Sequence, residues 1–174
     1  MATYKWVFLI PVLIACSRGR YPDCNFTNGF KGWTNSGRRS WMVVNSTMKD
    51  VGLLTGRQGS GDNFMIIKPS SYSKRGDEAK LYSNEIRGPV CMRFYFYLYG
   101  SETGYLKIRT KKPKSVVFNH YGNHGHKWNL AQIYLNFSLI DVYQIAILGK
   151  VGDPTSDASI AVDDISFENR TCEE

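Results

Sequence analysis

Two adjacent carboxylates interrupt an alternating apolar segment near the end of the chain. Within Ala158–Cys172, Ile160 and Val162 precede Asp163 and Asp164 with the period-2 pattern of a half-buried strand. Neighbouring strand residues point to opposite faces, so one acid must face inward. An inward carboxylate needs a cation, backbone N–H groups or a metal as its partner.

Three histidines, His120, His124 and His126, form the second cluster of residues that could do chemistry. His124 and His126 are spaced to reach one metal, but no cysteine or spaced acid completes a zinc site. A solvated loop is therefore the favoured interpretation. Nucleophile motifs and phosphate-cradling glycine loops are not found in the sequence, so we do not predict an enzyme.

The densest basic patch consists of Lys107, Arg109, Lys111, Lys112 and Lys114, and its last three lysines lie between two predicted strands. Such a patch is a candidate for binding heparan sulfate or other acidic glycans. The simpler interpretation is a solvated hairpin tip. The formal net charge of +7 is too modest for the electrostatic footprint of a nucleic-acid binder.

The first residues have the layout of a secretory signal peptide. Lys5 precedes an apolar run from Trp6 to Ala15, which is too short to span a bilayer and is followed by small residues. We predict a signal peptide over 1–19, a single domain over 20–174 and no membrane span. Four N-glycosylation sequons favour a secreted, extracellular glycoprotein; they begin at Asn25, Asn45, Asn136 and Asn169.

The rest of the chain predicts an all-β fold. Aromatic residues make up 14% of the sequence, and no segment has a long helical periodicity. Short strands recur with turn residues between them, which indicates an antiparallel sandwich. The segments expected to hold strands are 38–44, 64–68, 79–83, 89–100, 104–110, 115–120, 128–135, 142–148 and 158–172.

Motifs spread from Cys24 to Cys172 occur in a characteristic order. They are C-x-F at Cys24–Phe26, G-W-T at Gly32–Thr34, G-D-x-A-x-L-x-S at Gly76–Ser83, an aromatic strand from Cys91, and I-A-V-D-D-I at Ile160–Ile165. Together they resemble the MAM domain, named for meprin, neuropilin-type antigens and receptor tyrosine phosphatase mu. The resemblance implies a jelly-roll β-sandwich that acts as an extracellular adhesion or recognition module.

The resemblance also implies a disulfide between Cys91 and Cys172. The family's second N-terminal cysteine is replaced by Lys31, so no partner is assigned to Cys24. We therefore expect Cys24 to be an unpaired buried thiol or to form an intermolecular bridge. Pairing with Cys16 would require an uncut signal peptide.

Some members of the family bind calcium, and the resemblance makes Asp163 a weak calcium candidate here. Thr27 stands where the family has a glutamate, and Leu54-Thr55 stand where a loop acid is expected. Calcium prefers six to eight oxygen ligands, several of them charged. We therefore expect no cofactor, with the calcium site lost or weak.

Arg75, Gly76 and Asp77 form an integrin-type tripeptide in a polar turn, although Gly76 and Asp77 already belong to the family pattern. The favoured function is a secreted binding and adhesion module that recognises an extracellular or cell-surface protein, with self-association as one form. The alternatives are an acidic-glycan binder that uses the Lys107–Lys114 hairpin and a structural matrix component cross-linked through Cys24.

Overall fold

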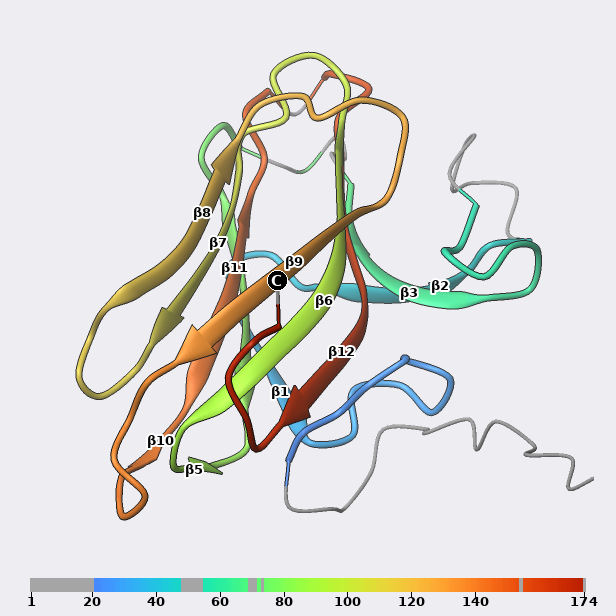
Figure 1. Cartoon of the computed structure of the whole chain (residues 1–174). Helices are drawn as coiled ribbons and strands as arrows, with labels where there is room; N and C mark the ends of the chain where they lie inside the picture. The colour runs from blue at the N-terminus through green and yellow to red at the C-terminus, as the bar shows by residue number, and fades with distance from the viewer. Residues whose placement is uncertain (1–20, 48–54, 69–71, 73, 154, 174) are drawn as a thin grey trace, which may run out of the picture.

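The computed structural model describes residues 21–47, 55–68, 72, 74–153 and 155–173. These residues form two five-stranded antiparallel sheets packed face to face, as Figure 1 shows. No helix occurs among them. The predicted signal peptide over 1–19 lies outside the described residues. In the described ranges, no helix is long and apolar enough to cross a membrane.

The front sheet has the strand order β2-β3-β12-β6-β9. Its strands are β2 (Met42–Asn45), β3 (Asn63–Ile67), β12 (Ser159–Glu168), β6 (Val90–Tyr99) and β9 (Asn129–Leu135). The back sheet has the order β1-β4-β11-β7-β8. Its strands are β1 (Trp33–Gly37), β4 (Glu78–Ser83), β11 (Ile145–Lys150), β7 (Tyr105–Thr110) and β8 (Val116–Tyr121). A short pair, β5 (Ile86–Arg87) and β10 (Val142–Tyr143), closes one end.

Alternation along each strand divides the side chains between the core and the outer faces. On β6, Phe94, Phe96 and Leu98 enter the core between the sheets, and they meet Ile108 of β7 there. A smaller apolar cluster of Phe64, Ile66, Tyr97 and Ala161 lies on the outer face of the front sheet. Burial on both faces explains why β6 reads as an almost continuous apolar run.

The jelly-roll β-sandwich predicted from the sequence is confirmed, with differences at some strand boundaries. The segment 142–148 was expected to be one strand, but it is divided between β10 and β11 because Gln144 turns its side chain to Ser83 O, at 2.8 Å. Strand β1 was not expected. It begins beside Gly32, and the indole N–H of Trp33 donates to Pro22 O at 2.9 Å.

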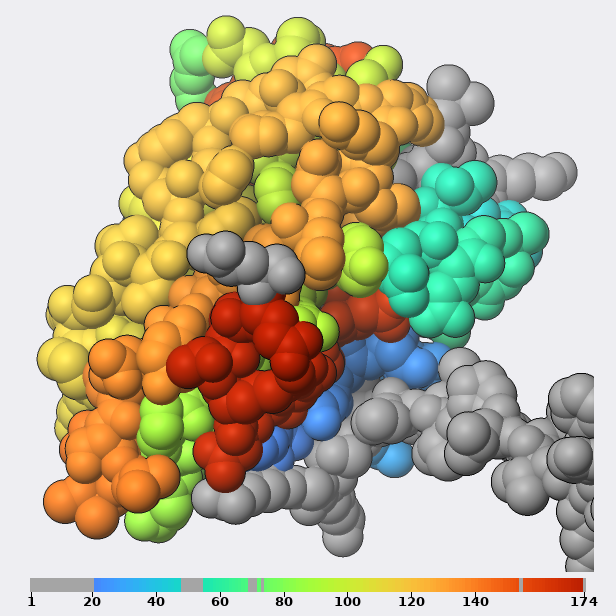
Figure 2. Space-filling view, in the orientation of Figure 1, coloured from blue at the N-terminus to red at the C-terminus, as the bar shows by residue number. Residues whose placement is uncertain are grey.

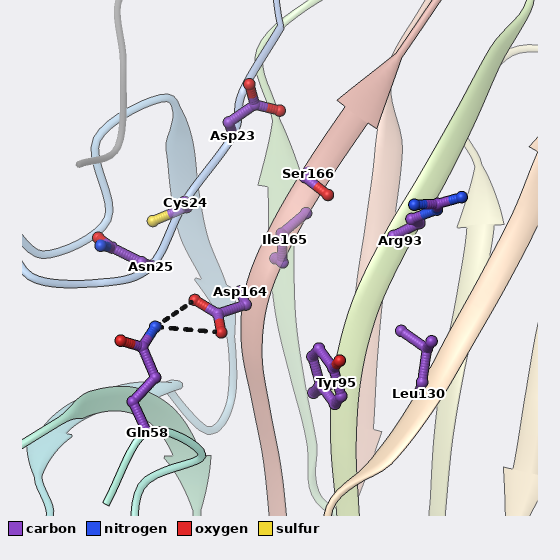
Figure 3. A pocket seen from close by; sticks show the side chains of 10 residues that line it. All are labelled: Asp23, Cys24, Asn25, Gln58, Arg93, Tyr95, Leu130, Asp164, Ile165 and Ser166. Atoms are coloured by element: carbon purple, nitrogen blue, oxygen red, sulfur yellow. Dashed lines mark hydrogen bonds between the residues drawn. The ribbon is translucent and has the colours of Figure 1, made fainter. Parts of the chain in front are cut away.

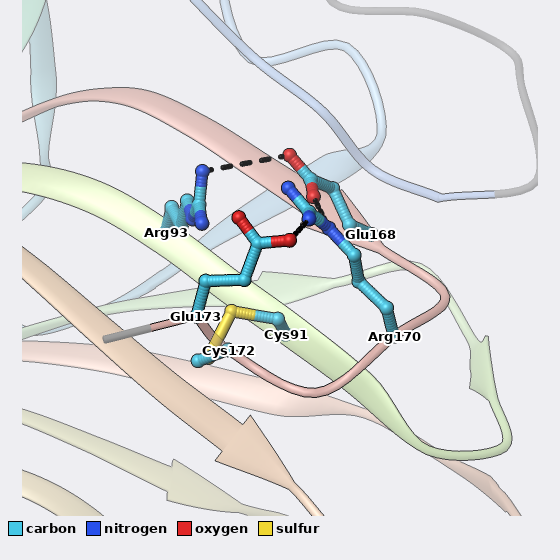
Figure 4. The surroundings of a disulfide bond; sticks show 6 residues. All are labelled: Cys91, Arg93, Glu168, Arg170, Cys172 and Glu173. Atoms are coloured by element: carbon cyan, nitrogen blue, oxygen red, sulfur yellow. Dashed lines mark hydrogen bonds and ion pairs between the residues drawn. A yellow bond between two sulfur atoms is a disulfide. The ribbon is translucent and has the colours of Figure 1, made fainter.

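The last residues of the chain fold back onto the front sheet (Figures 2 and 4). Cys172 forms the predicted disulfide with Cys91 of β6, across a sequence separation of 81 residues. Arg170 pairs with both Glu168 and Glu173, and this small ionic network lies beside the disulfide. The crosslink thus holds the segment after β12 against the strand that β12 pairs with.

Cys24 departs from the expectation of an unpaired thiol. The structure records no free thiol among its described cysteines, and Cys24 is disulfide-bonded to a partner outside the described residues. The expectation of an unpaired thiol is therefore wrong. The Cys24 backbone also exchanges two 2.8 Å hydrogen bonds with Ile165, which join the N-terminal segment to β12.

Removing the Cys91–Cys172 bond should destabilise the fold. The paired Cys91→Ser and Cys172→Ser change frees a long loop in the unfolded chain, so the free energy of unfolding should fall by about 2–4 kcal/mol. Urea denaturation followed by tryptophan fluorescence measures this. Arg170→Gln, which leaves the disulfide intact, serves as the control and should hardly move the midpoint. Equal midpoints for the paired variant and the control would contradict the prediction.

Candidate functional site

A groove of about 340 Å³ opens on the outer face of the front sheet (Figure 3). Its floor is formed by Arg93 and Tyr95 of β6 and by the segment Asp164–Ser166 of β12. Gln58 and the segment Asp23–Asn25 form one wall, and Leu130 of the edge strand β9 forms the other. The groove therefore combines apolar groups, amides and charges of both signs.

Beside the groove, an aromatic cluster covers part of the same sheet face. The ring of Trp128 packs edge-on against Phe64, with 5.6 Å between ring centroids, and its indole N–H donates to Thr55 O at 3.0 Å. His126 packs on Tyr97 and Tyr99 in the same region. A ligand approaching the front sheet in this part of the molecule therefore meets the groove and not the aromatic cluster.

A β-bulge in β12 places the two acids of the D-D-I motif. The β12–β6 register shifts between Asp163 and Ser166, and Asp164 adopts a φ of 46°. Asp residues tolerate this left-handed conformation better than most. Asp164 turns to the groove wall, where it pairs with Arg57 and accepts contacts at 3.4 Å from the side chain of Gln58.

Asp163 is the buried acid of the two, and of the partners expected for an inward carboxylate it has a backbone N–H group. One carboxylate oxygen accepts a 2.7 Å hydrogen bond from Asp164 N–H, whereas Oδ2 has no donor. Burial, followed by the charges of Asp164 and Asp62, raises the pKa of Asp163 to about 9. The raised pKa favours the neutral form of the Asp163 carboxyl beside Asp62.

Asp62 is the loop acid that the sequence analysis missed. Its carboxylate accepts the Gln58 N–H at 2.8 Å and the Asn63 N–H at 3.0 Å, immediately before β3. Thr55, where the loop acid was sought, instead offers its carbonyl to Trp128, and Leu54 lies outside the described residues. The sequence feature that could have identified Asp62 is its position in Gly59–Phe64, directly before the aromatic strand.

These residues do not fit the calcium site that the resemblance implies. Thr27 offers no charge, and the raised pKa of Asp163 favours the neutral form of the carboxyl that lies beside Asp62. The described part of the chain contains no group of three His, Cys, Asp or Glu residues able to hold a metal. Calcium requires more charged oxygens than this pair offers. A lost or weak calcium site stays a prediction.

The histidines are arranged differently from the expectation. Nδ1 of His120 lies 3.4 Å from Nε2 of His124, and His120 also stacks on Phe118. His126 instead packs between tyrosines, so the pair suggested by spacing, His124 and His126, is not the one that meets. Burial and the neighbouring His124 lower the pKa of His120. None of these histidines is hydrogen-bonded to a serine, threonine or cysteine within the described residues.

The basic patch divides into two parts. Lys107 and Arg109 alternate with buried residues on β7 and face outward from the back sheet. Lys111, Lys112 and Lys114 lie in the exposed turn of the predicted β7–β8 hairpin, whose pairing is confirmed. The sequence analysis placed Lys107 and Arg109 in the predicted strand 104–110 and the other three lysines between the strands, and the observed strands agree with this division.

The integrin-type tripeptide lies in a tight turn before β4. Arg75 is exposed and forms a 2.7 Å ion pair with Glu102. The Asp77 carboxylate accepts the Lys74 N–H at 2.9 Å, and Gly76 has a φ of 89° that other residues rarely adopt. Both charged ends of the motif therefore have partners within the fold, and its integrin role stays a prediction.

The sequons differ in their surroundings. Asn136 and Asn169 are exposed directly after β9 and β12, respectively. Asn45 is half-buried on β2, and its amide donates to Gly61 O at 2.7 Å and to Asn63 Oδ1 at 3.2 Å. Asn25 lines the groove, and its Oδ1 accepts the Thr27 N–H at 3.2 Å.

An exposed apolar surface, which we call the β9–β10 strip, was missed from the sequence. It consists of Leu130, Tyr134, Leu139, Ile140 and Val142. Leu139 is 71% exposed and Ile140 is 81% exposed, in the turn that projects at the lower edge of the molecule (Figure 1). The alternation of β9 placed Leu130 and Tyr134 on one face, but only the structure shows that this face is open.

The family model for the MAM domain (meprin/A5/mu) matches residues 24–173. The chain belongs to the MAM family. Neuropilin-1 of Gallus gallus is 27% identical over 166 residues, covering 88% of this chain and 18% of that protein. MAM domain-containing protein 2 of Homo sapiens is 26% identical over 162 residues, covering 87% and 22%. The MAM chain thus spans about a fifth of the length of these curated relatives.

Solved structures share the sandwich fold. The K1 cleaved adhesin domain of Lys-gingipain from Porphyromonas gingivalis W83 superposes with a TM-score of 0.65 at 9% identity, covering 87% of this chain and 99% of that one. TmCBM61, solved in complex with beta-1,4-galactotriose, has a TM-score of 0.56 at 14% identity, covering 84% and 94%. At these identities the likeness shows the fold alone.

The raised pKa of Asp163 should make the stability of the domain depend on pH. The folded state holds a proton that the unfolded state releases above a pKa of about 3.8, so stability should fall as pH rises toward 9, by at most about 1.4 kcal/mol per pH unit. In Asp163→Asn the amide donates where the acid proton did. The denaturation midpoints of this variant, measured between pH 5 and about 8.5, should therefore lack the decrease that Asp163 causes in the unchanged protein.

Glu85→Gln removes an exposed acid and is the control, which should retain the pH dependence of the unchanged protein. The prediction would be contradicted if millimolar Ca²⁺ at pH 7.5 raised the melting temperature of the unchanged protein but not that of Asp163→Asn. That result would show that a cation, and not a proton, stabilises Asp163 beside Asp62.

Glycan occupancy should follow the exposure of each sequon. We expect Asn136 and Asn169 to be glycosylated and Asn45 to be largely unmodified, because the Asn45 amide nitrogen is held by two hydrogen bonds. Peptide mapping by mass spectrometry after secretion from a eukaryotic host measures the occupancy of each site. Full occupancy of Asn45 would contradict the expectation, unless modification precedes folding of β2, which pulse labelling would reveal.

Proposed function

We propose that this MAM domain is a secreted, non-catalytic binding module that recognises an extracellular or cell-surface protein. The proposed contact surface is the β9–β10 strip together with the adjoining groove. The single observation that carries this proposal is the strip itself. It holds five of the nine large hydrophobic side chains that are exposed among the described residues.

Exposed apolar side chains that gather on one edge mark an interaction site more often than scattered ones do. Leu130 belongs to both the strip and the groove, so the apolar surface continues into a floor that carries the Tyr95 ring. The guanidinium of Arg57 lies 4.4 Å from the centre of that ring and pairs with Asp164. An apolar centre with charged groups at its border is the usual composition of a protein interface.

The extracellular assignment draws support from the MAM family match, the Cys91–Cys172 disulfide and the sequons. Disulfides form and persist in oxidising compartments. The groove offers no nucleophile with a hydrogen-bonded histidine, which agrees with a binding role. The activities of neuropilin-1 belong to a protein about five times longer, and they are not transferred to this chain.

Acidic-glycan binding is the second candidate function. The observation that favours it is the set of cations on and beside β7, and a sandwich of similar fold, TmCBM61, was solved with a bound oligosaccharide. This function uses the back sheet and protein recognition uses the front sheet, so one molecule can carry both.

Polar substitutions in the strip should abolish protein recognition without unfolding the domain. In Leu139→Ser combined with Ile140→Ser, two exposed anchors are lost, and truncation of an interface anchor typically costs about 2 kcal/mol or more. We expect binding of the tagged full chain to cells, measured by flow cytometry, to weaken about 30-fold or more. Aggregation of beads coated with the chain measures self-association in parallel.

Val116→Ser is the matched control, because Val116 is 56% exposed on β8 and does not belong to the strip. Its binding should equal that of the unchanged protein. If the strip variant and the control both bind normally, the strip is not the recognition surface. Melting temperatures within a few degrees of each other would confirm that neither variant acts through unfolding.

A further inference from the structure

Five cations come together at the outer face of the back sheet, contributed by segments far apart in sequence. Four of them lie on its strands, and Lys111, at the start of the turn after β7, reaches back over the Tyr82 ring. We call this surface the basic face; its cations are Lys80, Lys107, Arg109, Lys111 and Lys150. Strand β11 lies between β7 and β4, so Leu148 has Lys107 on one side and Lys80 on the other. Lys80 and Lys150 are not part of the basic run in the sequence, and only the register brings them to it.

The stems of these side chains lie along the sheet. Leu148 and Ala146 of β11 are almost completely buried although they face outward between cationic neighbours. Long cationic side chains commonly cover apolar surface in this way and leave their charged heads in water. The charges are thereby held over the sheet and are not spread through the surrounding solvent.

Tyrosine rings hold the charged heads in place. Lys107 Nζ lies 4.4 Å and Lys150 Nζ lies 5.7 Å from the centre of the Tyr105 ring. Lys111 Nζ lies 5.4 Å from the ring of Tyr82 and donates to Gln144 at 3.0 Å. Cation–π contacts of this kind restrict the side chains and lower the entropy lost on binding.

The spacing suits a long, narrow ligand. Lys150, Lys107, Arg109 and Lys111 occupy successive rows along β7 and its neighbour β11. Rows two residues apart are about 7 Å from each other, so the four rows extend over roughly 20 Å. Lys107 and Lys80 are two strands apart, which makes the strip roughly 10 Å wide.

The basic face carries one acid within the described strands, Glu78. Its burial raises its pKa, but the hydrogen bonds from Tyr105 and Lys80 and the charge of Arg109 together lower it. Glu78 is therefore ionised at neutral pH, pairing with Lys80 at 3.0 Å. Five cations and one carboxylate leave a surplus of four positive charges.

We propose that the basic face binds a linear sulfated polysaccharide lying along β7 and β11. This inference rests on the proposed extracellular location and refines the second candidate function. It assigns the contact to the sheet face and not to the hairpin tip. A chain with a sulfate on successive sugars matches a flat strip of cations whose charged heads the tyrosine rings hold in place. A membrane is a poorer match, because these cations lie on a strand face and not around a protruding loop.

Two double variants with the same charge change separate the basic face from the hairpin tip. Lys80→Gln with Lys150→Gln alters the basic face, whereas Lys112→Gln with Lys114→Gln alters exposed residues of the turn. The probe is heparin, used both as a column and in solution with the full secreted chain. We expect the face variant to bind heparin about tenfold or more weakly, with a shallower salt dependence, and the tip variant to change little.

A further variant tests the sign of the effect. Glu78→Gln removes the acid of the basic face and should strengthen heparin binding several-fold. Equal losses in the face and tip variants would mean that heparin responds to net charge, which would overturn the proposal. Equal binding of duplex DNA or of phosphatidylserine vesicles, with the same dependence on Lys80 and Lys150, would also overturn it in favour of a general polyanion surface.

Failure of this proposal and failure of the proposed protein recognition give different results. The strip variant with Leu139→Ser and Ile140→Ser should bind heparin normally. It should no longer bind to cells treated with heparinase, on which only protein receptors are left for it. The face variant should show the reverse pattern. Loss of both activities in one variant with an unchanged melting temperature would contradict the assignment of two separate faces.

Discussion

The antiparallel pairing of β12 with β6 is the interaction on which the rest of the structure depends. These two ten-residue strands lie at the centre of the front sheet, and β12 brings the last segment of the chain beside one from its middle. Cys172 then bonds to Cys91 on β6, and Cys24 bridges to Ile165 on β12. Both ends of the described chain are thereby fastened to the same pair of strands.

The bulge in β12 shows how this pairing also shapes the binding surface. One extra residue in β12 lets Asp163 stay buried beside Asp62 while Asp164 reaches Arg57 at the groove. A regular strand would have sent the second acid into the core, where an ionised carboxylate is very costly. The left-handed conformation of Asp164 therefore keeps this carboxylate out of the core and places it at the groove, where Arg57 pairs with it.

Much of the fold was predictable from the sequence, because alternation and turn residues act locally. The strand around Cys91, the β7–β8 hairpin and the disulfide follow from patterns within one segment or from family motifs. The surfaces are less predictable. The proximity of Asp62 to Asp163, of His120 to His124 and of Lys80 to Lys107 depends on strand register, which links residues distant in sequence. The exposure of the β9–β10 strip likewise depends on the arrangement of distant segments, because none in the described part of the chain covers it.

The inner faces of a two-sheet sandwich form the core, so its outer faces are the surfaces available for binding. In this MAM domain the two outer faces have acquired opposite chemistry. The open part of the front sheet presents apolar groups and balanced charges, where a partner gains by excluding water. The back sheet presents cations over buried stems, where a partner gains by replacing counterions. The core lies between the two sheets, but the two surfaces adjoin at one edge, where Val142 of the β9–β10 strip and Lys111 of the basic face line the same pocket. Small ligands on the two faces therefore use different residues, whereas a large ligand at this edge would contact both.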